Sequence, residues 1–252
     1  MSVSIVFIGL IVGFLVGLTG VGGAALLTPI LLLIGINPTI AVGSDFVYNS
    51  ITKMFGVIQH WRQKTINFKM VKYFSLGSLP SALLAFAILR HFDSIKRDEF
   101  IKYGLGYILI LVSISIIVRI VLDQRFRLKD KPFKTIEEKK GLTICMGAIF
   151  GFIVGLTSIG SGSLFALAML YLYRMSATEI VGTDIAHAFL LVTLTGLLNI
   201  SFGNVNYPLV FNLLVGSIPG VLIGSNLSAK VPAKPLKAAM ALVVLVSGLK
   251  LL

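Results

Sequence analysis

The stretch Gly13-Phe-Leu-Val-Gly-Leu-Thr-Gly-Val-Gly-Gly-Ala-Ala-Leu26 returns later in the chain as Gly151-Phe-Ile-Val-Gly-Leu-Thr-Ser-Ile-Gly-Ser-Gly-Ser-Leu164. Eight of the fourteen aligned positions are identical. In each copy an apolar run ends at a threonine, passes through a cluster of small residues, and becomes apolar again. In a chain this apolar, the pattern predicts a helix that is broken inside a membrane and starts again after the break.

The composition indicates a polytopic membrane protein. The 252 residues are 56% hydrophobic and 13% charged, whereas a soluble domain carries roughly 25% charged residues. The mean hydropathy is +0.97. Many apolar runs approach the length of about 20 residues that crosses a bilayer; the apolar segments are at about 3–19, 24–36, 40–60, 73–90, 101–122, 141–157, 162–173, 178–200, 208–227 and 235–252. The sequence therefore predicts an all-α membrane protein.

Two details of the sequence refine this expectation. The segment Met1-Ser-Val-Ser leads directly into apolar sequence, without a basic region or a cleavage site of small residues, so we expect a retained first helix and not a signal peptide. Cys145 is the only cysteine, which excludes an intrachain disulfide. Its counterpart in the first copy is the apolar Phe7, and we expect Cys145 to be a buried apolar side chain.

The duplication extends well beyond the opening motif. Three further motifs occur twice: Val42-Gly-Ser-Asp45 with Val181-Gly-Thr-Asp184, Asn67-Phe68 with Asn206-Tyr207, and Gly77-Ser-Leu-Pro80 with Gly216-Ser-Ile-Pro219. The two copies of each motif are separated by the same number of residues (184 − 45 = 206 − 67 = 219 − 80). The sequence therefore predicts two repeats of five segments, a first half at 1–122 and a second half at 141–252. A polar and basic linker at 123–140 joins the two halves.

The distribution of Lys and Arg predicts the orientation in the membrane. Eight basic residues lie between Arg119 and Lys140, whereas the N-terminus and the segments 36–44 and 201–207 have none. Because basic loops stay in the cytoplasm, the linker is expected inside and the N-terminus outside. Five segments is an odd number, so the second half enters from the opposite side and the repeats are inverted. One loop disagrees, because Arg90–Lys102 would lie outside although it contains four basic residues.

The two breaks are the expected binding site for a small anion. A simple kink needs one Gly or Pro, whereas each break here contains several small residues. The helix that starts after each break presents free N–H groups and about half a unit of positive charge. A packed crossing point without a ligand is the alternative. The substrate-binding candidates at the breaks are Thr19, Gly20, Gly22, Gly23, Thr157, Ser158, Gly160, Ser161 and Ser163.

Glycines at intervals of four precede each break. They are Gly9, Gly13 and Gly17 in the first half and Gly147, Gly151 and Gly155 in the second. At this spacing they share one face of a helix and allow another backbone to approach closely. We therefore expect them to serve helix packing and not ligand binding.

The third segment of each half carries a polar stripe. Its members follow one another mostly at helical spacing, and they are Asp45, Asn49, Thr52, Lys53, Gly56 and His60 in the first half, with Asp184, His187, Thr195 and Asn199 in the second. Charged groups within a membrane usually face water or partners. Asn49 and Lys53 are therefore further substrate-binding candidates, and Asp45, Asp184 and His187 are candidates for proton coupling. The two aspartates are expected to begin their helices, so capping is an equal alternative for them.

The combination of motifs resembles the sulfite exporter TauE/SafE family, also called the 4-toluene sulfonate uptake permease family. Besides the two breaks and the two Val-Gly-Ser/Thr-Asp motifs, it includes His60-Trp-Arg-Gln-Lys-Thr65, Gly203-Asn-Val-Asn206 and Gly216-Ser-Ile-Pro-Gly220. The resemblance covers nearly the whole chain. It implies a multi-pass protein of a prokaryotic plasma membrane that moves sulfite, thiosulfate or organosulfonate anions with protons. Members of the family often carry Asp where this chain has Asn67 and Asn206.

Three functions are compatible with the sequence. The leading hypothesis is a secondary transporter, an exporter of a small sulfur anion that works by alternating access. A passive anion channel of the same fold needs the same donors. An intramembrane serine hydrolase would use Gly160-Ser-Gly-Ser163 with His187, but the counterparts of Ser161, Ser163 and His187 are Gly23, Ala25 and Tyr48. We therefore expect no enzyme activity, no metal and no cofactor. We expect a monomer or homodimer without a nucleic-acid partner, because the basic residues lie mostly in short loops.

Overall fold

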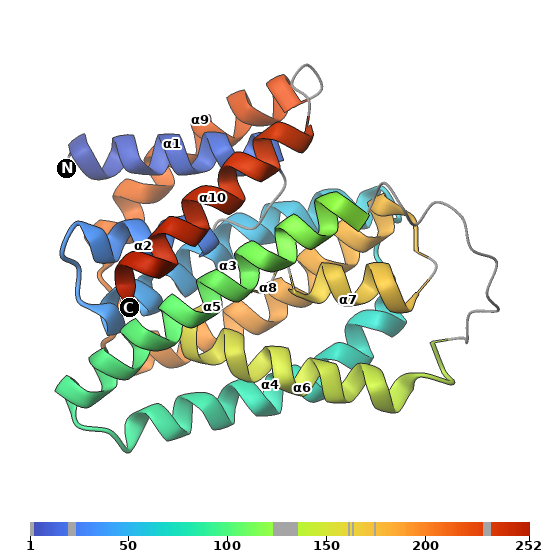
Figure 1. Cartoon of the computed structure of the whole chain (residues 1–252), viewed down its shortest axis with the longest axis horizontal. Helices are drawn as coiled ribbons and strands as arrows, with labels where there is room; N and C mark the ends of the chain where they lie inside the picture. The colour runs from blue at the N-terminus through green and yellow to red at the C-terminus, as the bar shows by residue number, and fades with distance from the viewer. Residues whose placement is uncertain are drawn as a thin grey trace.

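The computed structural model describes residues 3–19, 24–122, 136–160, 162, 164–173, 175–228 and 233–252. The regular elements in these ranges are α-helices (Figure 1), as the sequence predicts. Their bounds are α1 (Val3–Thr19), α2 (Ala24–Leu33), α3 (Pro38–Arg62), α4 (Phe68–Arg90), α5 (Ser94–Leu122), α6 (Lys140–Thr157), α7 (Leu164–Leu172), α8 (Ala177–Ser201), α9 (Tyr207–Ser228) and α10 (Ala233–Leu251). Each predicted apolar segment corresponds to one of these helices.

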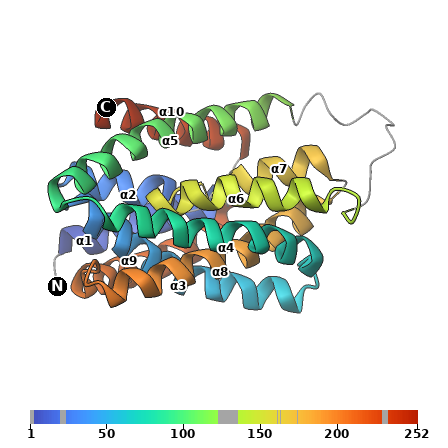
Figure 2. The same ribbon diagram turned by 90° about the horizontal axis from the view of Figure 1, so that it is seen from below.

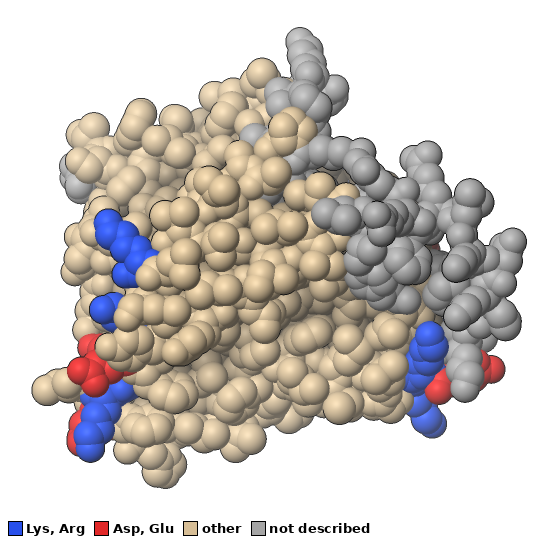
Figure 3. Space-filling model, viewed as in Figure 1, with Lys and Arg blue, Asp and Glu red and all other residues tan. Residues whose placement is uncertain are grey.

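The helices have the length and the surface of a membrane protein. Five spans among the described residues are long and apolar enough to cross a membrane, and these are Phe68–Arg90, Ser94–Val118, Lys140–Thr157, Thr178–Ser201 and Tyr207–Ser225. Two shorter apolar helices, Val3–Leu18 and Ala238–Leu251, accompany them. Figure 3 shows charged side chains at two opposite edges of one face, with an uncharged band between them. The prediction of an all-α polytopic membrane protein is confirmed.

One expectation about burial is wrong. Cys145 is exposed, and its counterpart Phe7 is 61% exposed. In a soluble protein such side chains would be drawn into the core, but the hydrocarbon of a bilayer accepts them equally well. Apolar character therefore does not predict burial in this chain.

The helices pack in pairs that join the two halves. The principal contacts are between α1 and α9, between α4 and α6, between α3 and α8, and between α5 and α10, and these partners lie side by side in Figures 1 and 2. A Cβ atom on Gly13 would lie 2.7 Å from the Cα of Ser217, and one on Gly151 would lie 2.5 Å from the Ser78 carbonyl oxygen. The glycine faces of α1 and α6 therefore contact the backbones of α9 and α4, which confirms their predicted packing role.

The second predicted helix break is present, whereas the first predicted break falls at residues 20–23, outside the described residues. α1 ends at Thr19 and α2 starts at Ala24, while α6 ends at Thr157 and α7 starts at Leu164. At the second break, Ser158 has a φ angle of 64° and Gly160 one of 100°, both in the left-handed region, and the Ser158 N–H donates to the Val154 carbonyl oxygen at 2.7 Å. This geometry ends α6. Several predicted residues lie outside the described ones: Gly20, Gly22, Gly23, Ser161, Ser163, the linker residues 123–135 and the side chain of Thr19.

The predicted capping role of the two aspartates is wrong. α3 starts at Pro38 and α8 at Ala177, so Asp45 and Asp184 each lie seven residues beyond the first residue of their helix (45 − 38 = 184 − 177 = 7). The caps come earlier because Asn37 accepts a hydrogen bond from the Ile40 N–H and Ser176 accepts one from the Glu179 N–H. Proline at the first helical position also favours this start of α3. The two carboxylates therefore lie well inside their helices and make contacts other than caps.

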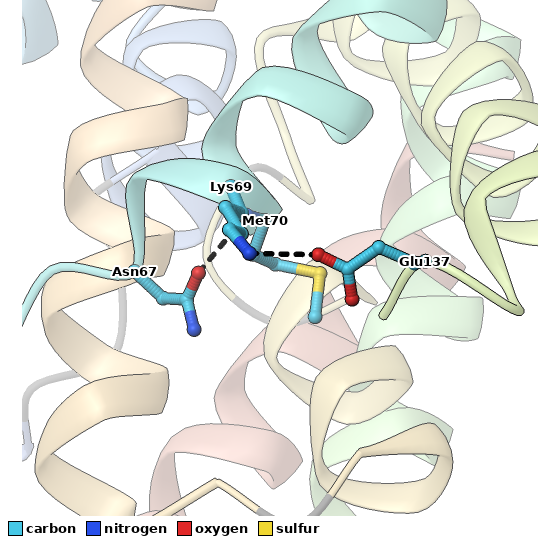
Figure 4. Close-up of polar contacts among 4 residues, drawn as sticks. All are labelled: Asn67, Lys69, Met70 and Glu137. Atoms are coloured by element: carbon cyan, nitrogen blue, oxygen red, sulfur yellow. Dashed lines mark hydrogen bonds and ion pairs between the residues drawn. The ribbon is translucent and has the colours of Figure 1, made fainter. Parts of the chain in front are cut away.

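Asn67 and Asn206 cap α4 and α9 and attach them to the opposite half. The side-chain oxygen of Asn67 accepts from the Met70 N–H at 3.1 Å (Figure 4), and that of Asn206 accepts from the Leu209 N–H at 3.0 Å. The backbone N–H of Asn67 donates to Thr183 of α8 at 3.0 Å, and that of Asn206 donates to Ser44 of α3 at 3.0 Å. The two asparagines thus hold equivalent structural positions.

Replacing Asn67 with Ala is expected to destabilise the protein by about 1 kcal/mol, because α4 loses its N-cap. Asn67→Asp should retain the stability, since an aspartate caps equally well. The matched control is Glu137→Gln, which removes the nearby Lys69–Glu137 ion pair of 2.8 Å (Figure 4). Both side chains of this ion pair are more than half exposed, so Glu137→Gln should leave the stability unchanged. The melting temperatures of these variants in detergent give their order of stability. An Asn67→Ala variant as stable as Glu137→Gln would contradict the capping role.

Candidate functional site

The centre of the site is the carboxylate of Asp45, which is fully buried. Its Oδ1 accepts a hydrogen bond from the Asn49 amide at 2.9 Å. Its Oδ2 accepts one from the hydroxyl of Ser158 at 2.5 Å. Asp45 belongs to α3 of the first half and Ser158 to the break of the second half. A buried hydrogen bond therefore joins the polar stripe of one half to the helix break of the other.

A second hydroxyl approaches the same carboxylate. Thr28 lies in the second turn of α2, and it is fully buried. Its Oγ1 has no hydrogen-bond partner with ideal geometry, but it is close enough to Asp45 to interact with the carboxylate. The sequence did not single out Thr28, because a threonine within a short apolar helix carries no distinctive signal. Asp45 is thus where α2 of the first half and the break of the second half converge.

The other described residues of the second break have local roles. The hydroxyl of Thr157 donates to the Ile153 carbonyl oxygen at 2.8 Å and accepts from the Ile159 N–H at 3.3 Å. The carbonyl oxygen of Gly160 accepts from the Leu164 N–H at 3.2 Å, which begins α7. Among the described members of this break, Ser158 is therefore the one whose side chain reaches α3.

Lys53 connects Asp45 with the second half. It is partly buried on α3, two turns or about 12 Å beyond Asp45 by helix geometry. Lys53 interacts electrostatically with Asp184 of α8 and, more weakly, with Asp45. Lys53, a predicted substrate-binding residue, therefore lies with the two predicted proton-coupling carboxylates in one polar region between α3 and α8. Asn49 belongs to the same region, but its amide is already engaged by Asp45.

His187 lies in an aromatic cluster, three residues beyond Asp184 on α8. It is 1% exposed, its Nε2 is 2.8 Å from the hydroxyl of Ser78, and its ring centroid is 4.2 Å from that of Phe165 and 5.7 Å from that of Phe74. Its Nδ1 is buried without a hydrogen-bond partner. In a serine hydrolase, the Nε2 of His187 would face a serine at the break. Here it contacts the hydroxyl of Ser78 instead. Ser161 and Ser163 lie outside the described residues.

Ser78 was not among the predicted site residues, although the sequence carries a signal for it. Ser78 and Ser217 are the serines of the repeated Gly-Ser-Leu/Ile-Pro motif. Ser78 contacts His187, and Ser217 interacts with the hydroxyl of Tyr48, which is the counterpart of His187. The two repeated serines thus hold equivalent aromatic residues of α8 and α3. Among the described residues, no cluster of three His, Cys, Asp or Glu side chains is arranged to bind a metal.

Comparison with known proteins agrees with this architecture. The family model described as "Sulfite exporter TauE/SafE" matches residues 5–251. The chain is 64% identical over 254 residues to "Probable membrane transporter protein YjnA" of Bacillus subtilis, with all of both chains covered. It is 24% identical to "Probable membrane transporter protein YunE" of the same bacterium, over 99% of this chain and 97% of the relative.

A similar archaeal protein is "Probable membrane transporter protein MJ0441" of Methanocaldococcus jannaschii, at 25% identity over 98% of this chain and 94% of the relative. No solved structure matches the chain. The family match spans nearly every residue, and the relatives in it are named as membrane transporters, not enzymes. The protein is therefore a multi-pass membrane transporter that belongs to the sulfite exporter TauE/SafE family.

Proposed function

We propose that the protein exports a small sulfur-containing anion, such as sulfite, thiosulfate or an organosulfonate, together with protons by alternating access. The observation that carries the proposal is the buried hydrogen bond between Ser158 and Asp45. The carboxyl group of Asp45 could hold a proton, and it contacts the helix break that we propose as the anion site. The name of the family supports a sulfur oxyanion as the substrate.

The halves are proposed to be inverted repeats. Equivalent contacts occur twice, with the partners exchanged: Asn67 with Thr183 and Asn206 with Ser44, and Gly13 with Ser217 and Gly151 with Ser78. The partners in α3, α4, α8 and α9 are related by the same offset as the repeated motifs. α1 and α6 run in opposite directions in Figure 1. These features support a pseudo-two-fold axis in the membrane plane and, with it, alternating access by movement of one half against the other.

Asp45 is proposed to couple the anion to the proton. In its charged form the carboxylate uses the Ser158 hydroxyl and repels an incoming anion. When Asp45 takes up a proton, the repulsion is removed, and the Ser158 donor becomes available to an oxyanion. Lys53 supplies a positive charge in the same region. The anion and the proton then travel together, so an intracellular excess of the anion drives export.

The proposed orientation follows from the basic residues. The linker, the start of α4 and the start of α10 lie on the cytoplasmic side, and the N-terminus lies outside. Multi-pass insertion in a bacterial plasma membrane agrees with the bacterial relatives. Asp184 and His187 remain proposed members of the proton path, and the two breaks remain the proposed substrate site.

Counterflow across proteoliposomes tests the proposed function. Vesicles loaded with unlabelled thiosulfate should transiently accumulate external labelled thiosulfate above equilibrium, and sulfite or sulfonates should compete with it. A pH gradient, acidic on the side of entry, should increase the net flux. The membrane potential is held at zero with potassium and valinomycin, because under that condition a passive channel only dissipates gradients and produces no counterflow. Vesicles without accumulation for any of these anions would overturn the proposed function.

A further inference from the structure

A cavity of about 330 Å³ lies at the end of the molecule where α4 ends and α5 begins. This end is at the left of Figure 1, and charged side chains gather along the same edge in Figure 3. The volume is at the lower end of the range of roughly 300–1,000 Å³ for small-molecule sites. The wall includes Arg90, Arg97, Thr39, Asn199 and Asn204. The cavity is thus large enough for a small hydrated ion.

The charge of the cavity wall is entirely positive. Arg90 and Arg97 line it, and no carboxylate is among the described lining residues. The Nε of Arg97 is buried without a hydrogen-bond partner, and neither arginine forms an ion pair with a described residue. The guanidinium of Arg90 lies 4.0 Å from the ring centroid of Phe202, which holds its plane in place. Arg90 is exposed, but a buried guanidinium N–H without a partner is costly, so a ligand that accepts from the Arg97 Nε would satisfy that group.

The nearest acidic neighbour in sequence forms no ion pair with these arginines. Asp98 follows Arg97 directly, but its carboxylate accepts hydrogen bonds from the Asn37 amide and the Thr39 hydroxyl, each at 2.5 Å. It is therefore held by the loop between α2 and α3 and the first turn of α3. The amide of Asn204 donates to the Asn199 side-chain oxygen at 3.3 Å and completes the polar part of the wall.

The two arginines are not a remnant of the duplication. The starts of α4 and α9 differ by the same offset as those of α5 and α10 (207 − 68 = 233 − 94), so the equivalents of Arg90 and Arg97 are positions 229 and 236. These positions hold Ala229 and Leu236. The arginine pair therefore belongs to one half alone. It also gives a reason for the basic loop Arg90–Lys102 on the side predicted to lie outside, where the distribution of basic residues disagrees with topology rules.

The cavity leads toward the central site. Val42 and Gly155 line it, and each precedes by three residues a member of the Asp45–Ser158 pair, a rise of about 4.5 Å. Phe46 also lines the cavity and is fully buried. The cavity thus ends about one helical turn from the hydrogen bond between the two halves, with an aromatic ring in its wall.

We propose that this cavity is an outer binding site for the small oxyanion, held by the guanidinium groups of Arg97 and Arg90 on its way to or from Asp45 and Ser158. The identity of the anion rests on the proposed function. Guanidinium groups offer paired donors that match the oxygens of such an anion. The same chemistry would also hold the phosphate of a lipid headgroup, so the experiment has to separate the two sources.

Counterflow in vesicles of phosphatidylcholine tests the outer site. Arg97→Gln should raise the half-saturating external thiosulfate concentration about tenfold, the loss of one charge-assisted contact, with the maximal rate nearly unchanged. Arg90→Gln should act in the same direction. Arg97→Lys, which keeps the charge but loses the planar donors, should be intermediate. The matched control is the double variant Lys96→Gln with Lys102→Gln, which lies on α5 like Arg97 but outside the cavity wall, and it should match the unmodified protein.

The outcomes are distinguishable. If the unmodified protein shows no counterflow, the proposed function fails. If it shows counterflow and both arginine variants keep the same half-saturating concentration, the outer site is wrong. Retention of phosphatidylglycerol, measured by native mass spectrometry, covers the second source: loss of bound lipid in Arg97→Gln with unchanged thiosulfate affinity would identify a headgroup site and overturn the inference. If Arg97→Gln does not yield folded protein, Arg90→Gln and Arg97→Lys decide.

Discussion

Replacing Asp45 with Asn is expected to abolish the response of transport to a pH gradient. The amide cannot take up a proton, so net flux driven by the gradient should fall to the level of protein-free vesicles. Counterflow should persist, because exchange of the anion does not require net proton movement. Flux measured with and without an acidic exterior, at equal thiosulfate concentration, gives the result.

The geometry around Asp45 makes this substitution interpretable. The Asn49 amide donates to Oδ1, and the Ser158 hydroxyl donates to Oδ2. In Asp45→Asn the retained oxygen can still face Asn49, while the new amide can donate to the Ser158 hydroxyl, so both hydrogen bonds survive. The protein is therefore expected to fold normally.

Two further variants complete this test. Asp93→Asn changes an exposed carboxylate in the loop between α4 and α5 and should leave the pH response intact. Asp184→Asn examines the second proposed carboxylate, which interacts with Lys53. A pH response that survives in Asp45→Asn and is lost in Asp184→Asn would assign the proton to α8 and contradict the role of Asp45.

Replacing Gly151 with Ala is expected to destabilise the protein strongly, by about 3 kcal/mol, at the upper end for overpacked sites. The added Cβ would lie 2.5 Å from the carbonyl oxygen and 2.6 Å from the Cβ of Ser78, with the Cα of Ser78 equally close. These are mainly backbone atoms, which cannot rotate away as a flexible side chain would. α4 and α6 would have to separate, and Ser78 also carries the contact to His187.

The duplication provides a second variant and a control for this prediction. Gly13 faces Ser217 with a similarly close approach, 2.7 Å to its Cα, so Gly13→Ala should lower the melting temperature by a similar amount. Gly104 of α5 faces open space, with no atom within 4 Å of the position that a Cβ would take, and Gly104→Ala should be neutral or stabilising. Thermal melting in detergent, with the folded fraction measured by size-exclusion chromatography, gives the order of stability of these variants. A Gly151→Ala variant that melts at the same temperature as Gly104→Ala would contradict the close packing of α4 on α6.

Much of the architecture could be predicted from local patterns. The apolar segments, the break after Thr157 and the glycine faces of α1 and α6 all agree with the structure. A bilayer imposes a length and an apolar character on each span, and close backbone approach imposes small residues at fixed intervals. Such constraints act within one segment, so they can be recognised in the sequence of that segment. The repeat spacing adds correspondence between segments, which pointed to α3 and α8 as equivalent polar helices.

The partners of the polar side chains could not be predicted in this way. Ser158 is 158 − 45 = 113 residues from Asp45, and His187 is 187 − 78 = 109 residues from Ser78. No sequence pattern fixes which hydroxyl meets which carboxylate or ring across two packed halves, because that depends on helix angles and on where each break places its first residue. The start of α3 at Pro38 similarly turned Asp45 from an expected cap into a buried carboxylate.

The sequence by itself thus determined that this chain is a membrane protein of helices with repeated motifs and an interruption after Thr157, because lipid and close packing act on each segment separately. Only the tertiary structure decided that the break of the second half binds Asp45 of the first, and that Arg90 and Arg97 line a cavity about one turn away. These arrangements bring together side chains from different segments, and only the packing of the helices sets the distances between them.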